Sequence, residues 1–265
     1  MEPFASVPEQ PEAKRLLGAA LASGGAHESL AALEVLRRHP SVAGCPVGLL
    51  GFSQGGWVSL VAASLSPDLV DFVVALSGPG VGPAEQDRYR IERDLRTRAA
   101  SEEDVREGLS WIDERARRLL AGEAVETVLA DQERLADRPW YKDATRYFDN
   151  PFALAFLARN LDFDPVPVLE QVRCPVLALF GGDDTLVPVY ESTVSYARHL
   201  PASRRGQHGI AVFPGADHGL FTGDPEPGIA RTEQLAPGFL PMLAAFLTRQ
   251  EGSPVEAERT MARAR

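Results

Sequence analysis

One stretch of the chain, residues 47–57, limits strongly what the protein can fold into. An apolar run, Val47-Gly48-Leu49-Leu50, leads into Gly51-Phe52-Ser53-Gln54-Gly55 and then into a helix-compatible segment. The pattern G-x-S-x-G in this setting predicts a strand, a sharp turn and a helix, with the serine hydroxyl exposed above the end of a sheet. The alternative is a glycine-rich turn with an incidental serine. The choice between the two depends on whether the chain offers catalytic partners for Ser53.

The residue types around Ser53 fit a nucleophilic serine. We expect the turn to be crowded two residues before and after the serine, where Gly51 and Gly55 have no Cβ to clash and tolerate strained backbone angles. The helix that begins near Gln54 would point its backbone N–H groups and positive dipole end at the serine, where an oxyanion would form.

Helical and strand-like segments alternate along the rest of the core. A helix is expected over 28–38, separated by Gly24-Gly25 from a short helix at 14–21. Val47–Phe52 is continuously apolar, which predicts a parallel strand buried on both faces. Further strands are predicted at 71–76, 175–180 and 210–213, and further helices at 54–66, 190–200 and 237–248. These segments predict an α/β fold with a mainly parallel sheet flanked by helices.

Residues 83–160 have a different texture. They are rich in Arg, Glu, Ala and Leu with helical spacing, and we expect helices at 85–100, 102–120 and 123–135 with shorter pieces at 140–147 and 152–157. We interpret this block as a helical cap inserted into a core made of 1–82 and 161–249. The alternative is a set of packing helices beside the sheet. The tail 250–265 is predicted to be disordered.

Ser53 needs a base, and the base needs an acid that orients it. Asp183 and Asp184 follow one predicted strand and His218 follows the next, and open α/β sheets place their sites at the carboxyl ends of strands. We favour Asp184 over its neighbour Asp183, and we interpret Asp217 as a turn former. Four other histidines occupy less suitable places, at a loop, helix ends or a strand entrance: His27, His39, His199 and His208.

Composition excludes several classes of function. The formal net charge of −10 argues against nucleic acid and anionic membranes as partners. There is no signal-like segment and no apolar run long enough to span a bilayer, so we expect a cytoplasmic protein. Cys45 and Cys174 each precede a strand-like run, and we expect two buried thiols rather than a disulfide framework.

Taken together, these motifs resemble those of the α/β-hydrolase superfamily, especially the branch of dienelactone hydrolases and prolyl oligopeptidase-like serine hydrolases. The matching stretches are Gly51-Phe52-Ser53-Gln54-Gly55-Gly56-Trp57, Ser77-Gly78-Pro79, Cys174 to Gly181 with Asp184-Thr185-Leu186-Val187-Pro188, and Ala216-Asp217-His218-Gly219. In that family the acid is the aspartate three residues before a Val-Pro pair, which selects Asp184.

The chain departs from the family pattern at its N-terminus. The family places several strands before the nucleophile turn, and a loop after an early strand supplies a second oxyanion donor. Here only 46 residues precede Val47, and none forms a convincing strand. We therefore expect an α/β-hydrolase fold that is N-terminally truncated. The strand at 47–52 would then present an open edge, which favours a homodimer or aggregation.

The resemblance implies a serine hydrolase that cleaves carboxylic esters through an acyl-enzyme, with Ser53 as nucleophile, His218 as base, Asp184 as orienting acid and the Gln54 N–H as oxyanion donor. A peptidase or thioesterase would use the same residues. The partner expected is a small ester or acyl substrate, and no metal or cofactor is implied. The rival hypothesis is a weak or inactive remnant that binds a ligand or partner.

Overall fold

The core of the protein is a four-stranded parallel sheet. The computed structural model describes residues 20–202, 207–224 and 230–251. The strands lie in sequence order, β1 (Leu49–Phe52), β2 (Val73–Leu76), β3 (Val176–Gly181) and β4 (Gly209–Phe213). Each pairs in parallel with the next, with Phe52 opposite Leu76 and Leu76 opposite Leu179. The predicted mainly parallel sheet is confirmed.

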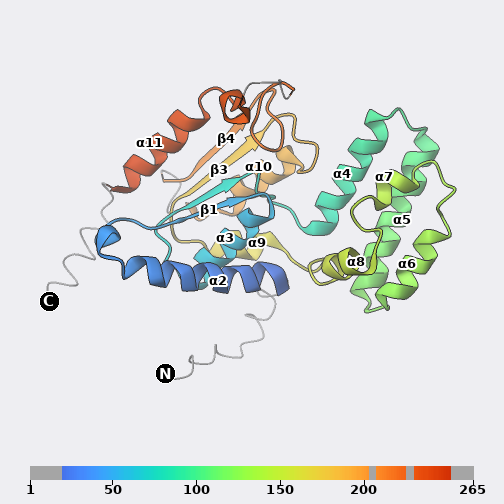
Figure 1. Ribbon diagram of the computed structural model, residues 1–265, viewed down its shortest axis with the longest axis horizontal. Coiled ribbons are helices and arrows are strands. Elements are labelled where there is room, and N and C mark those ends of the chain that lie inside the picture. The colour runs from blue at the N-terminus through green and yellow to red at the C-terminus, as the bar shows by residue number, and fades with distance from the viewer. Residues whose placement is uncertain (1–19, 203–206, 225–229, 252–265) are drawn as a thin grey trace.

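Helices cover the two faces of this sheet unequally (Figure 1). On one face, α3 (Gln54–Leu65) and α10 (Val189–His199) pack on β2 and β3 together with α2 (Ala20–Arg37) and α9 (Pro165–Gln171). On the other face, α11 (Phe239–Glu251) packs Phe239 and Phe246 against the apolar side chains of β2, β3 and β4. Short 3-10 turns follow α2 at Pro40–Val42 and precede α11 at Arg231–Gln234.

The first strand is less buried than its sequence predicts. In the part of the chain that the structure describes, β1 has a neighbouring strand on one side only. Leu50 and Phe52 point to the face that α11 covers over β2–β4, and they are 56% and 49% exposed. The prediction of burial on both faces is therefore wrong for β1, because apolar character records what a strand can bury, not whether a layer lies over it.

Several local predictions also need correction. The helix α2 runs through Gly24-Gly25 without a break, and a Cβ at Gly25 would lie 3.3 Å from Val58, so the small residue lets α2 approach α3 closely. The helix α9 was not predicted, although Asp164 accepts a hydrogen bond from the Val166 N–H and Pro165 occupies the first helical position.

The predictions for the two cysteines and for the C-terminal helix need smaller corrections. Cys174 is buried as expected, but Cys45 is exposed in the turn before β1. The helix α11 extends to Glu251, so the predicted tail begins two residues too early. Residues 252–265, like the predicted helical residues 14–19, lie outside the described ranges.

Residues 83–158, which lie between β2 and β3 along the chain, form a separate group of helices beside the sheet (Figure 1). Two apolar clusters hold the group together, one around Ile91 and Trp140 and one around Val128 and Leu154. The chain enters this helical lobe from the carboxyl end of β2, and six residues separate that strand from α4. Its helices are α4 (Pro83–Thr97), α5 (Glu102–Leu120), α6 (Val125–Glu133), α7 (Tyr141–Thr145) and α8 (Pro151–Ala158).

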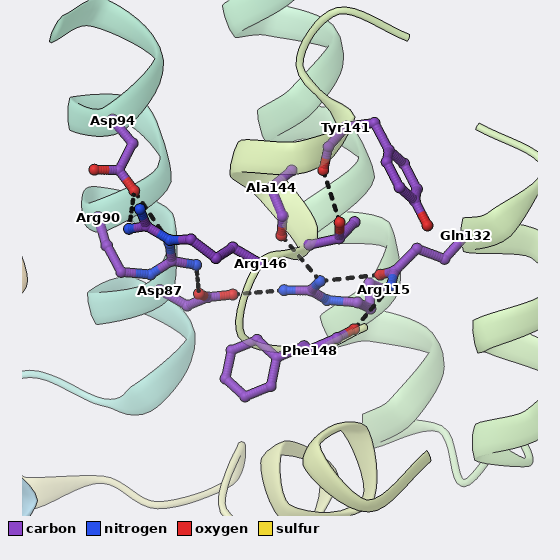
Figure 2. A network of polar contacts seen from close by, with 10 residues as sticks. Asp87, Arg90, Asp94, Arg115, Gln132, Tyr141, Ala144, Arg146 and Phe148 are labelled. Carbon is purple, nitrogen blue, oxygen red and sulfur yellow. Dashed lines mark hydrogen bonds and ion pairs between the residues drawn. The ribbon is translucent and has the colours of Figure 1, made fainter. Parts of the chain in front are cut away.

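A buried polar network joins the helices of this lobe (Figure 2). The guanidinium of Arg115, on α5, donates to Asp87 on α4 at 2.7 Å and to Gln132 on α6 at 3.1 Å. Asp87 also pairs with Arg90 at 2.8 Å, and the Ala144 carbonyl accepts from Arg115 at 3.3 Å. Burial lowers the pKa of Arg115, and the charge of Asp87 opposes that effect. The carboxylate of Asp87 is therefore the counter-charge that makes this interior possible.

Candidate active site

Ser53 occupies the single-residue turn between β1 and α3. Its backbone angles are φ 53° and ψ −123°, outside the regions that most non-glycine residues adopt. Its N–H donates to the Leu76 carbonyl at 2.8 Å, and its hydroxyl forms no capping hydrogen bond with α3. A strained backbone of this kind persists only where the surroundings enforce it. Because the hydroxyl does not cap α3, it is available for chemistry.

Two glycines, Gly51 and Gly56, supply the space for this turn. Of these two, only Gly51 was predicted to do so. A Cβ at Gly51 would lie 2.0 Å from the Gly55 carbonyl oxygen, so no side chain fits there. At Gly55, nothing lies within 4 Å of an added Cβ, and the predicted crowding is wrong. The close approach occurs one residue later, where a Cβ at Gly56 would lie 2.7 Å from the Cα of Gly78.

Alanine substitutions should therefore have opposite effects at the two predicted positions. We expect Gly51→Ala to destabilise the protein by about 1–3 kcal/mol or more, because the methyl group meets backbone that cannot move away. Gly55→Ala should stabilise it by about 0.5–1 kcal/mol, because alanine favours the helix and the site is open. Urea denaturation of the two variants beside the parent protein measures both effects. Equal midpoints for the two variants would contradict this account.

Asp184 and His218 are brought together from the loops after β3 and β4. The Asp184 Oδ2 lies 2.7 Å from His218 Nδ1, while its Oδ1 accepts hydrogen bonds from the N–H groups of Leu186 and Val187 at 2.8 and 3.0 Å. The Asp184 side chain is fully buried. Its charge is thus held by hydrogen bonds in a fixed orientation, whereas the neighbouring Asp183 is exposed.

The contacts of His218 hold its ring between Asp184 and Phe52, the residue before Ser53. With Nδ1 bonded to Asp184, the neutral ring carries its proton on Nδ1 and leaves Nε2 free to accept one. The ring packs on that of Phe52, with centroids 4.9 Å apart, and Phe52 immediately precedes Ser53. Among the described residues no hydrogen bond joins the Ser53 hydroxyl to His218. Such bonds are often long without substrate and tighten in the complex.

The fourth predicted site residue, Gln54, is the first residue of α3. The first amides of a helix have no acceptor within the helix, and the helix dipole adds positive potential there. The N–H of Gln54 can thus stabilise negative charge beside Ser53. Asp217 acts as the predicted turn former, since its Oδ1 accepts from the N–H groups of Gly219 and Phe221.

Two further residues contact this arrangement that the sequence did not single out. The hydroxyl of Ser77 donates to the His218 carbonyl at 2.8 Å. Ser77 begins the matching stretch Ser77-Gly78-Pro79, but the sequence assigned it no role. The hydroxyl of Tyr89, on α4, donates to the Asp184 carbonyl at 3.0 Å across 95 residues of sequence, a contact that no local pattern could indicate. Burial raises the pKa of Tyr89, opposed by Arg93, so this hydroxyl stays protonated at neutral pH.

Two other features, a membrane-spanning helix and a metal-binding cluster, are absent from the described ranges. No helix there is both long and apolar enough to cross a bilayer. Likewise, no group of three or more His, Cys, Asp or Glu side chains in those ranges could hold a metal ion.

Comparison with known proteins places this geometry in a family. A family model described as "Alpha/beta hydrolase family" matches residues 15–232. The chain belongs to the alpha/beta hydrolase family, and the expected superfamily is confirmed. The match does not distinguish the dienelactone hydrolase and prolyl oligopeptidase-like branch from other branches. No curated protein matches the sequence.

Three solved structures illustrate what the chain is similar to. An esterase from Pyrococcus furiosus is 16% identical with a TM-score of 0.50, and the match covers 88% of this chain and 64% of that one. An E-2-(acetamidomethylene)succinate hydrolase is 22% identical with a TM-score of 0.46, covering 86% and 74%. A proline iminopeptidase from Mycobacterium smegmatis is 18% identical with a TM-score of 0.43, covering 83% and 71%. The chain thus spans between 64% and 74% of the lengths of these three proteins, and the likeness concerns the fold.

Proposed function

We propose that the protein is a serine hydrolase that cleaves carboxylic esters through an acyl-enzyme. The observation that carries the proposal is the hydrogen-bonded pair of Asp184 and His218, whose imidazole packs on the residue before Ser53. A buried carboxylate, an imidazole with a free Nε2 and a serine on a strained turn are the three groups that acyl transfer to serine needs.

In the proposed reaction, Ser53 Oγ attacks the acyl carbon while His218 Nε2 takes the hydroxyl proton. Asp184 holds the ring and stabilises the imidazolium, and the Gln54 N–H binds the oxyanion. Collapse of the intermediate expels the alcohol, which leaves with the proton from His218. Water, deprotonated by His218, then attacks the acyl-enzyme, so that the acid is released and Ser53 is regenerated.

Esters are a better match to this site than amides. Gln54 supplies the oxyanion donor that we assign, and one such donor typically contributes about 10²–10³-fold to turnover. An ester carbonyl is more electrophilic than an amide carbonyl, and an alkoxide leaves more readily than an amide anion, so ester cleavage demands less of the site. A thioester shares that advantage, and the proposal extends to thioesterase activity before peptidase activity.

The helical lobe, residues 83–158, is the proposed border of the substrate pocket. Its first helix, α4, contacts the loop of the proposed acid through Tyr89 and Asp184. A lobe attached at this point can shape what approaches the proposed nucleophile, which is the role we assign to the cap.

The rival function is that of a binding protein with little or no catalysis. One observation favours it, namely the exposed face of β1 beside the proposed nucleophile, where Leu50 and Phe52 meet no covering layer among the described residues. An exposed apolar face of this kind could bind an apolar ligand or partner without any acyl transfer.

Covalent labelling tests the proposal without knowledge of the substrate. We expect a fluorophosphonate probe to label the purified protein, with the modification located at Ser53 by mass spectrometry. His218→Ala should remove the labelling because the serine then lacks its base. His199→Ala is the matched control, since that histidine also pairs with a carboxylate, Glu170, at 3.0 Å, but on the surface.

The outcomes separate the two functions. Labelling at Ser53 in the parent protein and in His199→Ala, but not in His218→Ala, supports the hydrolase. A folded sample that stays unlabelled, or one labelled equally in both variants, overturns the proposal and favours the binding protein.

A further inference from the structure

Two consecutive residues at the end of β2 hold both partners of the proposed proton transfer. The carbonyl of Leu76 accepts from the Ser53 N–H at 2.8 Å. The hydroxyl of the next residue, Ser77, donates to the His218 carbonyl at 2.8 Å. The strand β2 lies between β1 and β3, and the N–H of Ser77 donates to the Leu179 carbonyl at 2.7 Å, so the dipeptide is fixed from both sides.

The conformation of Ser77 indicates that its hydroxyl is needed. Ser77 is completely buried and has φ 46°, a region that favours glycine. A non-glycine residue there costs about 1–2 kcal/mol. Glycine would relieve that strain, but it would leave the His218 carbonyl without its side-chain donor.

The contact with the His218 carbonyl holds the backbone of His218, which the contacts of its ring do not hold. Asp184 holds Nδ1, and Phe52 flanks one face of the ring. Both act on the side chain, which can follow a shift of its backbone by changing its torsion angles. The bond from Ser77 acts on the backbone of His218 itself, and therefore fixes where the side chain starts.

We propose that Ser77 is a positioning residue that sets the separation between the serine nucleophile and its histidine base. This proposal rests on the proposed hydrolase function. The backbone of Ser53 is hydrogen-bonded to Leu76, the last residue of β2, and the backbone of His218 to Ser77, the residue after it. One short segment therefore sets the positions of both backbones. Asp217 holds the turn at 217–221 together, so without the Ser77 hydroxyl this turn can shift as a unit relative to β2.

The test compares two variants that both lack the hydroxyl, Ser77→Ala and Ser77→Gly. We expect kcat on a short activated ester to fall by about 10- to 100-fold in both, because displacements near 1 Å cost about that much, with little change in KM. The rate of fluorophosphonate labelling should fall by a similar factor. Thermal stability should differ between the variants, since glycine relieves the strain at φ 46° and alanine does not.

Ser64→Ala is the matched control. The hydroxyl of Ser64, on α3, also donates to a backbone carbonyl at 2.8 Å, that of Val61, but it contacts none of the proposed site residues. Its kcat and labelling rate should equal those of the parent protein.

The possible results are distinguishable. If the parent protein neither labels nor hydrolyses esters, the proposed function itself fails. If the parent is active and both Ser77 variants keep its kcat, or if activity follows thermal stability across the two variants, the positioning role of Ser77 is overturned. A shared loss of kcat that is independent of stability supports it.

Discussion

Ser53→Ala is expected to lower ester turnover by about 10⁴-fold or more, because the proposed acyl-enzyme cannot form without the hydroxyl. The fold should be unaffected. The Ser53 side chain is half-buried and makes no capping hydrogen bond, so its removal leaves neither a cavity nor an unpaired buried group. Steady-state hydrolysis of a chromogenic short-chain ester measures the effect.

The design of this experiment must separate lost chemistry from lost structure. Urea denaturation should give a stability within about 0.5 kcal/mol of the parent. Fluorophosphonate labelling of the variant should disappear together with turnover. A variant that keeps ester hydrolysis, at a level above that of a mock preparation purified in parallel, would rule out Ser53 as the nucleophile.

Asp87→Ala is expected to destabilise the helical lobe by about 3–5 kcal/mol, because it leaves buried positive charge without its counter-charge. Arg115 is completely buried and donates to Asp87, whereas Arg90, which is 6% exposed and also donates to Asp87, keeps Asp94 as a second carboxylate at 3.3 Å. Without Asp87, the guanidinium of Arg115 keeps Gln132 and the Ala144 carbonyl as acceptors, which are neutral. Neutral acceptors cannot replace a carboxylate in a site closed to water.

The matched control for this substitution is Asp113→Ala. Asp113 pairs with Arg88 at 2.6 Å, and both side chains are largely exposed. We expect a loss of about 0–1 kcal/mol for this exposed pair. Urea unfolding followed by tryptophan fluorescence reports on the lobe, because Trp111 and Trp140 belong to it. Equal losses for the two aspartates would show that burial does not set the value of the Asp87 contacts.

Local chemistry explains why much of the proposed site could be predicted. The turn at Ser53 is specified by an apolar strand, a glycine that tolerates crowding and a helix start, all within seven residues. Asp184 and His218 each follow an apolar run, and parallel strands align their carboxyl ends at one edge of the sheet. These relations depend on order along the chain, which the sequence contains.

Contacts between distant segments could not be predicted in the same way. The sequence predicted crowding at Gly55, whereas the close approach is between Gly56 and Gly78 and depends on how α3 lies on the end of β2. Cys45 was expected to be buried, but it is exposed in the turn before β1. In both cases the residue type was compatible with either outcome.

The sequence by itself determined the α/β class, the parallel strands and the order of Ser53, Asp184 and His218, because these follow from short-range periodicity and turn chemistry. Only the tertiary structure decided that Ser77 and Tyr89 hold the backbones of His218 and Asp184, and that one face of β1 is exposed. Side-chain direction and layer coverage arise from packing between segments far apart in sequence, and packing is a property of the whole chain rather than of any one stretch.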